Sequence, residues 1–131
     1  MDCLFCSIVA GDVPSRKVYE DDVAYAFLDI APWHKGHTLV IPKRHVDDLT
    51  GDAEVMQEIA PAVSRVARLL VDRLDADGIN MLSSAGPVAG QEVFHLHVHL
   101  VPRYGEHPGL GELFRKQVEE DPDQVLAQIL G

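Results

Sequence analysis

Three histidines alternate with apolar residues in the segment 94–101. Successive side chains of a β-strand point to opposite faces, so a strand over this segment would hold His95, His97 and His99 on one face. Neighbouring imidazoles would lie roughly 6.5–7 Å apart, which lets two of them reach one phosphate or one metal ion. A neutral imidazole is also a good nucleophile near neutral pH. The spacing therefore predicts one chemical site on one face of one strand.

Two other interpretations of these histidines compete with that site. A polar strand face turned to water is the ordinary outcome for a lone histidine, but three in alternation after a Gly-Gln pair favour a site. A metal ion held by all three histidines would strain the spacing of a strand. A catalytic or phosphate-binding site is therefore the leading interpretation.

Cys3 and Cys6 are the only cysteines and are separated by two residues. This spacing is half of a structural zinc site, which needs four ligands, so the other half must come from elsewhere. Two reduced cysteines that pack as small apolar side chains are the alternative. The N-terminal residues lack the pattern of a signal peptide, and no segment reaches the length of a membrane span. We therefore expect a cytoplasmic protein without a structural disulfide.

The charge of the chain disfavours several classes of partner. With 131 residues, the chain is long enough for about one domain with its own core. Its formal net charge of −10 repels nucleic-acid backbones and anionic membranes, so we expect neither duplex nucleic acid nor a membrane as partner. An anionic ligand would have to be held by imidazoles, backbone N–H groups or a helix N-terminus.

The first elements that would position these residues are strands followed by one long helix. Residues 18–28 indicate two strands joined by an acidic turn, and residues 37–41 a third strand that Pro42 stops. Apolar residues then recur at helical spacing from residue 52 to 74, with Asp52 as the N-cap. Gly78 would stop this helix, and Pro61 would delay its start or kink its first turns.

Two further strands and a helical tail complete the predicted α+β fold. Residues 79–84 indicate a short strand, residues 85–91 a loop, and residues 94–101 the histidine strand, which Pro102 would end. Apolar residues near the C-terminus indicate one or two short helices broken near Pro122.

Five blocks of this sequence resemble the histidine triad (HIT) family of nucleotide-binding proteins, in the bacterial type of its Hint branch with a Cys-x-x-Cys zinc site. The resemblance covers residue 3 to about residue 105 and is most specific around the three histidines. The blocks are Cys-Leu-Phe-Cys at 3–6, Tyr-Glu-Asp-Asp at 19–22, Ala-Phe-Leu-Asp-Ile at 26–30, Gly-His-Thr-Leu-Val-Ile-Pro-Lys-Arg-His at 36–45, and Ala-Gly-Gln-Glu-Val-Phe-His-Leu-His-Val-His-Leu-Val-Pro-Arg at 89–103.

The resemblance implies a HIT-like fold and a homodimer. The fold would have a mainly antiparallel β-sheet, one long helix and C-terminal helical segments. Residues 1–131 would form a single HIT domain, with a core over about 3–105 and a C-terminal extension over about 106–131. The strands would continue across the interface between two copies of the chain.

The resemblance also implies a hydrolase that acts on purine nucleoside phosphoramidates or related nucleotidyl compounds. His97 would be the nucleophile and would form a covalent nucleotidyl-histidine intermediate. His99 and Gln91 would hold the nonbridging oxygens, with His37 near the phosphate end, and no metal would be required for the chemical step.

For the nucleoside, the resemblance implies a carboxylate on the ribose hydroxyls and apolar side chains around the base. Asp29 matches the carboxylate, and a carboxylate among apolar neighbours needs a partner. Phe27 and Ile30, with Ile8 or Leu39, would surround the base, although core packing explains such residues equally well. The remaining nucleotide-binding positions would be Ser84, Gln91, Val93 and His99.

The zinc site implied by the resemblance combines Cys3 and Cys6 with His45 and His95. Such a metal would tie the N-terminus to the histidine strand. The sequence departs from the family pattern at Ser84, where many members carry asparagine, and Glu92 replaces a serine found in some members.

Two other functions stay open from the sequence. The first is a zinc-stabilised module that binds purine nucleotides, regulates or scaffolds a partner, and shows little turnover. The second is a dinucleoside polyphosphate hydrolase. The physiological leaving group, and the roles of Trp33, His34, His107 and the acidic tail, are not predicted.

Overall fold

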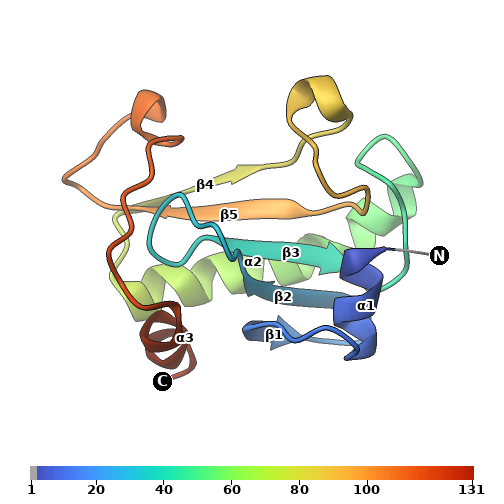
Figure 1. The fold of residues 1–131 in the computed structure, drawn as a ribbon, viewed down its shortest axis with the longest axis horizontal. Coiled ribbons are helices and arrows are strands. Elements are labelled where there is room, and N and C mark those ends of the chain that lie inside the picture. The colour runs from blue at the N-terminus through green and yellow to red at the C-terminus, as the bar shows by residue number, and fades with distance from the viewer. Residues whose placement is uncertain (1–2) are drawn as a thin grey trace.

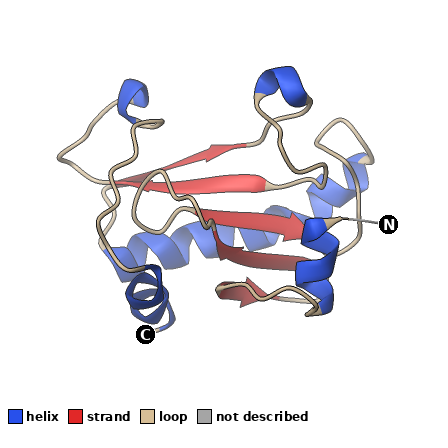
Figure 2. Cartoon of the chain, viewed as in Figure 1, coloured by secondary structure: helices blue, strands red, loops and turns tan. Residues whose placement is uncertain are grey.

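A five-stranded antiparallel sheet forms the centre of the computed structural model, which describes residues 3–131 (Figures 1 and 2). The long helix α2 lies on one face of the sheet, and the short helix α1 lies on the other. The strand order is β1-β2-β3-β5-β4. In chain order the elements are α1 (Leu4–Ala10), β1 (Lys17–Glu20), β2 (Ala24–Leu28), β3 (Thr38–Pro42), α2 (Ala53–Leu74), β4 (Gly78–Leu82), the 3₁₀ turn η1 (Pro87–Ala89), β5 (Val98–Arg103), the 3₁₀ turn η2 (Leu110–Glu112) and α3 (Pro122–Leu130). This arrangement confirms the predicted α+β class.

Both faces of the central strands are buried, and the alternation along β2 shows how. Ala24, Ala26 and Leu28 pack with α2 in the larger core. Tyr25 and Phe27, on the opposite face, pack with α1 in a smaller apolar cluster. Since neighbouring side chains of a strand alternate between faces, small residues lie toward the long helix and aromatic residues toward α1. The aromatic face is the one that carries the candidate site.

The strand pairing sets one row of side chains across four strands on the α1 face. Phe27 of β2 lies opposite Leu39 of β3, Leu39 lies opposite His99 of β5, and His99 lies opposite Leu82 of β4. Directly opposed residues share a face of the sheet. The predicted hairpin over 18–28 and the predicted third strand are therefore both present and bring Phe27 into line with His99.

The predicted histidine strand over 94–101 is wrong at its start and at its end. Strand β5 begins at Val98, and the Leu96 N–H donates to the Val46 carbonyl, 2.8 Å away, instead of joining a strand ladder. His95 and His97 therefore lie in an irregular approach to the strand. Pro102 lies inside β5, where it is paired with β4 only, because pairing with β3 ends at Leu100. A proline is tolerated where no partner needs its missing N–H.

The long helix confirms the predicted element over 52–74, with two corrections. Asp52 caps it by accepting a hydrogen bond from the Glu54 N–H at 2.9 Å. Pro61 does not delay the helix, which starts at Ala53, and lies within it on the exposed side. The predicted stop at Gly78 is wrong, because Asp75 takes a left-handed conformation and ends the helix earlier. Gly78 begins β4 instead. Pro42, which was predicted to stop the third strand, is the last residue of β3.

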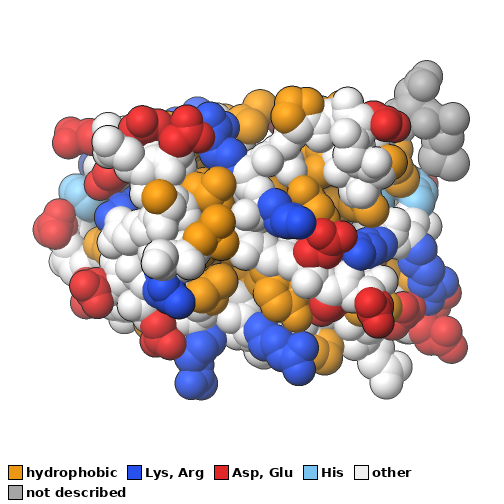
Figure 3. Space-filling view, turned by 90° about the horizontal axis from the view of Figure 1, so that it is seen from below, with side chains coloured by type: hydrophobic (Ala, Val, Ile, Leu, Met, Phe, Trp, Pro, Cys, Tyr) orange, Lys and Arg blue, Asp and Glu red, His pale blue; other side chains and the backbone are white. Residues whose placement is uncertain are grey.

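Two features of the termini add to the predicted fold. Helix α1 was not predicted; the Cys3 thiol caps it by accepting from the Cys6 N–H. The predicted C-terminal helix is present as α3, and Pro122 is its first residue rather than a break. Acidic and basic side chains are interspersed with apolar ones on the face seen from below (Figure 3). Within residues 3–131, no helix combines the length and the apolar character that crossing a bilayer requires.

Candidate active site and metal centre

A cavity of about 610 Å³ opens on the α1 face of the sheet, above the row formed by Phe27, Leu39, His99 and Leu82. Residues of helix α1, of the end of β2, of the segment around η1 and of the segment after η2 line it. The cavity brings together most of the predicted nucleotide site. The predicted residues that line it are Ile8, Phe27, Asp29, Ile30, Leu39, Ser84, Val93, His97 and His99.

The His97 ring is oriented by the backbone just before it. Its Nδ1 lies 2.8 Å from the carbonyl oxygen of His95, which can only accept, so Nδ1 carries the proton. Nε2 is then the nitrogen with the free lone pair. The side chain is 8% exposed and lines the cavity, and its ring meets the Phe5 ring edge-on at 5.2 Å. An aimed, neutral imidazole of this kind is suited to attack an electrophile.

The second imidazole of the cavity, His99, is fixed through two buried neighbours. The Trp33 backbone N–H donates to Nδ1 of His37 at 3.1 Å, so His37 carries its proton on Nε2. That Nε2 donates to Nδ1 of His99 at 2.9 Å. His99 therefore carries its own proton on Nε2. The arrangement makes His99 a hydrogen-bond donor beside the candidate nucleophile, with 5.0 Å between the two ring centroids.

Burial keeps this relay uncharged at neutral pH. Burial lowers the pKa of His37 to about 4, although the nearby Asp29 carboxylate acts in the opposite direction. Burial and then the His37 ring lower the pKa of His99 to about 4. The desolvated environment disfavours the protonated form of both rings. His99 therefore donates a hydrogen bond because its neutral tautomer carries the proton on Nε2, and not because the ring is positively charged.

Asp29 lies where β2 ends and presents its carboxylate to the cavity. One oxygen accepts from the Ala31 N–H at 2.8 Å, and the other lies 3.6 Å from Nε2 of His37. The side chain is 19% exposed. Its remaining lone pairs can accept hydrogen bonds from hydroxyl groups of a ligand.

Two of the predicted catalytic residues do not line the cavity. Gln91 is 4% exposed, and its amide is occupied by backbone groups: Oε1 accepts from the Gly86 N–H at 2.8 Å, and Nε2 donates to the carbonyls of Asp47 at 2.7 Å and Val93 at 3.1 Å. His37, 1% exposed, lies behind His99. The structure thus gives Gln91 a role in holding the loop over 84–91 and His37 a role behind the donor, and their predicted contacts with phosphate stay predictions.

Four potential metal ligands lie together at the N-terminal end of α1, with their ligand atoms within 4.8 Å of one another: Cys3, Cys6, His45 and His95. The ring Nε2–H of His95 donates to the Pro42 carbonyl, and that of His45 to the Asp47 carboxylate, each at 2.8 Å. Both Nδ1 atoms consequently present lone pairs, and they lie only 3.1 Å apart. Two acceptor nitrogens at this distance repel each other unless a cation lies between them.

The spacing of these four ligands fits tetrahedral zinc. Ordinary zinc bond lengths with tetrahedral angles give roughly 3.3 Å between two nitrogens and about 3.5 Å between nitrogen and sulfur. The observed sulfur-to-Nδ1 distances are 3.4 Å from Cys3 to His95 and 3.5 Å from Cys6 to both histidines. The Pro42 carbonyl and the Asp47 carboxylate accept from the other ring nitrogens of His95 and His45. Metal-binding histidines usually have such outer partners.

A second cluster, formed by Asp29, His37 and His99, has similar spacing but does not fit a metal ion. The Trp33 N–H occupies the Nδ1 lone pair of His37, which leaves a proton and not a lone pair on Nε2. A metal at this nitrogen would require the relay to be broken.

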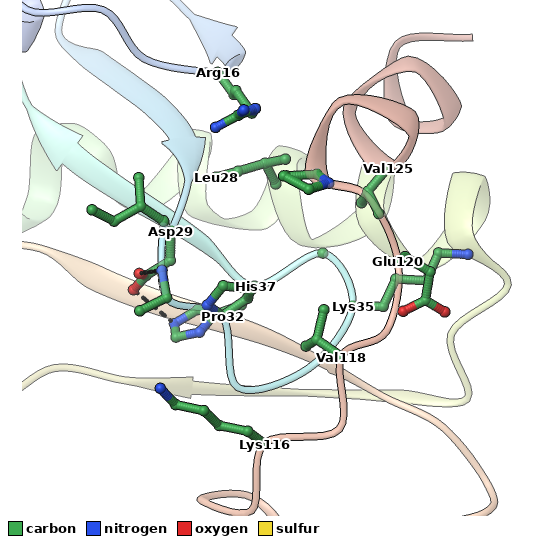
Figure 4. A pocket seen from close by; sticks show the side chains of 14 residues that line it. Arg16, Leu28, Asp29, Pro32, Lys35, His37, Lys116, Val118, Glu120 and Val125 are labelled. Atoms are coloured by element: carbon green, nitrogen blue, oxygen red, sulfur yellow. Dashed lines mark hydrogen bonds and ion pairs between the residues drawn. The ribbon is translucent and has the colours of Figure 1, made fainter.

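A second cavity of about 310 Å³ lies on the other side of Asp29, between the end of β2 and the C-terminal segment (Figure 4). Leu28, Pro32, Val118 and Val125 supply apolar walls. Its basic side chains, Arg16, Lys35 and Lys116, are balanced by Asp29, Glu120 and the partner of Arg16, Asp123 at 2.7 Å. This balance gives the second cavity no clear preference for a charged ligand.

Sequence reasoning missed several residues of the main cavity. Leu4 and Phe5 come from the helix that was not predicted, and Trp33, Phe114 and Lys116 come from a loop and from the C-terminal segment. Leu4 and Phe5 lay within the recognised block 3–6, and Trp33, the only tryptophan, lay four residues before His37, whereas Phe114 and Lys116 gave no signal.

Comparisons with known proteins agree with this geometry. The family model described as "HIT domain" matches residues 10–106. The chain is 43% identical over 129 residues to "Protein hit" of Bacillus subtilis, an alignment that covers 98% of this chain and 89% of the relative. It is 41% identical over 112 residues to a Schizosaccharomyces pombe protein named "Adenosine 5'-monophosphoramidase hnt1", covering 85% of this chain and 81% of the relative.

A solved structure supports the fold independently. The crystal structure of a "ZN-bound histidine triad family protein" from Mycobacterium smegmatis superposes with a TM-score of 0.86 at 40% sequence identity. The match covers 98% of this chain and 91% of that chain. The fold is thus shared over nearly the whole length of this chain.

Proposed function

This chain belongs to the HIT domain family, and on that premise we propose that it hydrolyses purine nucleoside phosphoramidates or related nucleotidyl compounds through a covalent intermediate on His97. One observation carries the proposal. The His95 carbonyl holds the proton of His97 on Nδ1, which leaves the Nε2 lone pair in a cavity where His99 supplies an N–H. The relative named as an adenosine phosphoramidase supports this substrate class.

The reaction would proceed in two displacements at phosphorus. In the first, Nε2 of His97 attacks, a nitrogen–phosphorus bond forms, and the bond to the leaving amine breaks as that amine takes up a proton from solvent, which the attacking water returns in the second. In the second, water attacks the nucleotidyl-histidine, releases a nucleoside monophosphate and regenerates the neutral ring. His99 and Ser84 would donate hydrogen bonds to the nonbridging oxygens, because phosphoryl transfer depends on positioned donors. No metal takes part in these steps.

The nucleoside would occupy the α1 end of the cavity. Phe5, Phe27 and Leu39 supply buried apolar surface for a purine ring, with Ile8 beside them and Ile30 at the rim. The Asp29 carboxylate would accept hydrogen bonds from the ribose hydroxyls. Burial of a planar ring against aromatic side chains would hold the phosphorus in front of His97.

Zinc would act as a structural ion at Cys3, Cys6, His45 and His95, as in the bacterial type of the Hint branch. When bound, it would supply a crosslink between the N-terminus, the segment after β3 and the approach to β5. The His95 residue links this site to the reaction, because its ring faces the thiols while its carbonyl orients His97. The zinc-bound relative supports this assignment.

The same proposal includes the assembly of the protein. The core over about 3–105 and the extension over about 106–131 would fold as one domain, and two chains would form a cytoplasmic homodimer. The outer strand β4 offers a suitable edge, since no other strand of residues 3–131 pairs with its outer side and Met81 is 65% exposed.

A nucleotide-binding module with little turnover is the second candidate. The Ser84 hydroxyl favours it, because this short side chain lines the cavity where an asparagine would reach further toward a phosphate. Such a module would keep the cavity and the zinc site but would hydrolyse nucleotidyl compounds only slowly.

A fluorogenic adenosine phosphoramidate separates these candidates. We expect release by the wild-type protein, loss of release in His97→Ala, and unchanged release in Glu54→Ala, whose side chain is exposed on α2. Samples denatured at alkaline pH, where a nitrogen–phosphorus bond to histidine survives, should show one adenylate on the wild-type chain by mass spectrometry and none on His97→Ala. Saturable AMP binding without release would favour the module, and faster cleavage of diadenosine polyphosphates than of phosphoramidates would favour the polyphosphate hydrolase.

A further inference from the structure

We propose that Trp33, Phe114 and Lys116 form a subsite for the leaving group, and that this subsite selects an aromatic amine that also carries an anionic group. An aromatic amino acid joined to phosphorus through its amino nitrogen, with its carboxylate free, has this chemistry. The inference rests on the proposed function and adds to it the identity of the group that departs.

A line of rings gives the cavity a direction. Consecutive ring centroids lie 5.0–5.3 Å apart, and the line runs from the proposed base site past the nucleophile to the C-terminal segment. If the nucleoside fills the α1 end, the part of the cavity that remains for the leaving group is the part lined by Trp33, Phe114 and Lys116. In order, the rings are Phe27, Phe5, His97, His99, Trp33 and Phe114.

At the far end of this line, hydrogen bonds hold the backbone of residues 112–117 in place. The His34 ring N–H is shared between the carbonyls of Glu112 and Leu113, both at 3.0 Å, and the Gln117 N–H donates to the Trp33 carbonyl at 2.8 Å. Phe114 and Lys116 lie between these two anchors. The backbone is therefore fixed on both sides while the Phe114 ring stays 64% exposed and available to a ligand.

Trp33 and Phe114 offer an aromatic surface. The Trp33 ring is stacked on His99 with an interplanar angle of 10°, and Phe114 meets Trp33 edge-on at 71°. Both line the cavity together with His99. Aromatic rings favour such offset and edge-on neighbours beyond the area that they bury. An aromatic leaving group would extend this cluster.

Lys116 supplies the preference for an anion. Among the described residues that line the main cavity, it is the only lysine or arginine, although it also lines the second cavity. Over residues 3–131 it forms no ion pair. The two carboxylates of the cavity, Asp29 and Glu92, come from the end of β2 and from the loop before β5. On a chain with a net charge of −10, an anionic group needs such a local cation.

The test compares adenosine phosphoramidates that differ only in the amine. Phenylalanine against phenylalaninamide isolates the carboxylate, and phenylalanine against alanine isolates the ring. We expect Lys116→Met to lower kcat/KM about threefold for phenylalanine and to leave phenylalaninamide unchanged. Phe114→Leu should lower kcat/KM about fivefold for phenylalanine and leave alanine unchanged.

Matched controls remove the same groups outside the cavity. Arg115→Met takes one positive charge from the neighbouring position, and Phe94→Leu removes an exposed ring. Neither residue lines the cavity. Both control variants should keep the wild-type preference. An equal loss on all substrates in Lys116→Met would place this lysine on the phosphoryl group and overturn the inference, as would unchanged ratios in both test variants.

Binding separates this inference from the proposed function. In a His97→Ala background the intact phosphoramidates serve as ligands, and the fluorescence of Trp33, the only tryptophan, reports their dissociation constants. We expect phenylalanine to bind more tightly than phenylalaninamide, and Lys116→Met to abolish the difference. If wild type hydrolyses nothing but this preference persists, the subsite stands and the hydrolase does not. If wild type hydrolyses the alanine compound but shows no binding preference, the hydrolase stands and the subsite does not.

Discussion

A single hydrogen bond decides which nitrogen of each imidazole can act. The His95 carbonyl keeps the His97 proton on Nδ1, which leaves the Nε2 lone pair for the cavity. The Trp33 N–H, acting through His37, makes His99 a hydrogen-bond donor. Two histidines in the same cavity therefore have opposite roles. Backbone groups that do not touch the substrate set these roles.

The low pKa values of His37 and His99 predict how stability depends on pH. Both rings ionise at about 4 in the folded chain, below the usual 6.5 of the unfolded one. The unfolded chain therefore binds more protons between these values, and the free energy of unfolding falls as pH decreases from 6.5 to 4. Urea unfolding of zinc-loaded protein at several pH values should show this slope, and a shallower one in His37→Gln. Equal slopes would contradict the assignment, because any acid-induced zinc loss is common to both proteins.

The stack of Trp33 on His99 predicts a positioning effect on the donor. Trp33→Phe keeps a flat ring on His99 and should keep most of kcat, whereas Trp33→Leu should lower kcat about tenfold and leave KM for the alanine phosphoramidate within about twofold. The backbone N–H that reaches His37 is present in both variants. Imidazole ¹⁵N shifts of His99 should change in Trp33→Leu only. A loss that falls mainly on KM would instead place the ring in binding.

At the scale of elements, α1 and the loop over 84–91 hold the site from two sides. Helix α1 is seven residues long, which is too short to be stable alone, so it depends on its packing and on Cys3 and Cys6. The loop depends on Gln91, whose amide bonds three backbone groups.

Zinc removal should therefore loosen α1 first. We expect about one zinc per chain in protein purified without chelator. Cys6→Ser should lose the metal and lower the melting temperature by about 10 °C, which corresponds to roughly 3 kcal/mol for a chain of this size. Metal analysis and thermal unfolding measure both. Ser7→Ala is the control on the same helix. Full zinc retention in Cys6→Ser would rule out the four-ligand site.

Gln91→Ala distinguishes a loop support from a phosphate ligand. Loss of its three backbone bonds should speed hydrogen exchange over residues 84–91 and lower kcat/KM about tenfold, since buried backbone groups lose their partners. If exchange over the loop stays at the wild-type rate while kcat falls, Gln91 contacts the phosphoryl group as the family resemblance implies.

At the scale of the whole molecule, periodicity predicted the elements better than it predicted the site. The hairpin, the third strand, the long helix with its Asp52 cap and the C-terminal helix follow from patterns that local physics enforces. Alternation failed at His95 and His97, because the Leu96 N–H finds the Val46 carbonyl, a partner distant in sequence. Helix α1 was missed because seven residues hold too little periodicity. The approach of Trp33 and Phe114 depends on tertiary contacts that no local pattern encodes.

The exposed edge of β4 predicts the oligomeric state. We expect a dimer by light scattering, and Met81→Asp should shift it to a monomer because a charge on the edge strand opposes pairing. Leu130→Asp places the same charge on α3, where a 56% exposed side chain is removed from that edge, and should leave the dimer intact. A wild-type monomer, or a dimer that Met81→Asp does not affect, would exclude β4 as the interface.

The row of Phe27, Leu39, His99 and Leu82 joins the floor of the cavity to the pairing of four strands. A slip of one residue in any of these strands would turn its cavity side chains toward α2 and its core side chains toward the ligand. A sheet with one of these strands out of register therefore cannot both bury its core and bind the ligand. The chain completes its binding floor in the same event that completes its core, and every copy that reaches the native sheet has this floor already assembled.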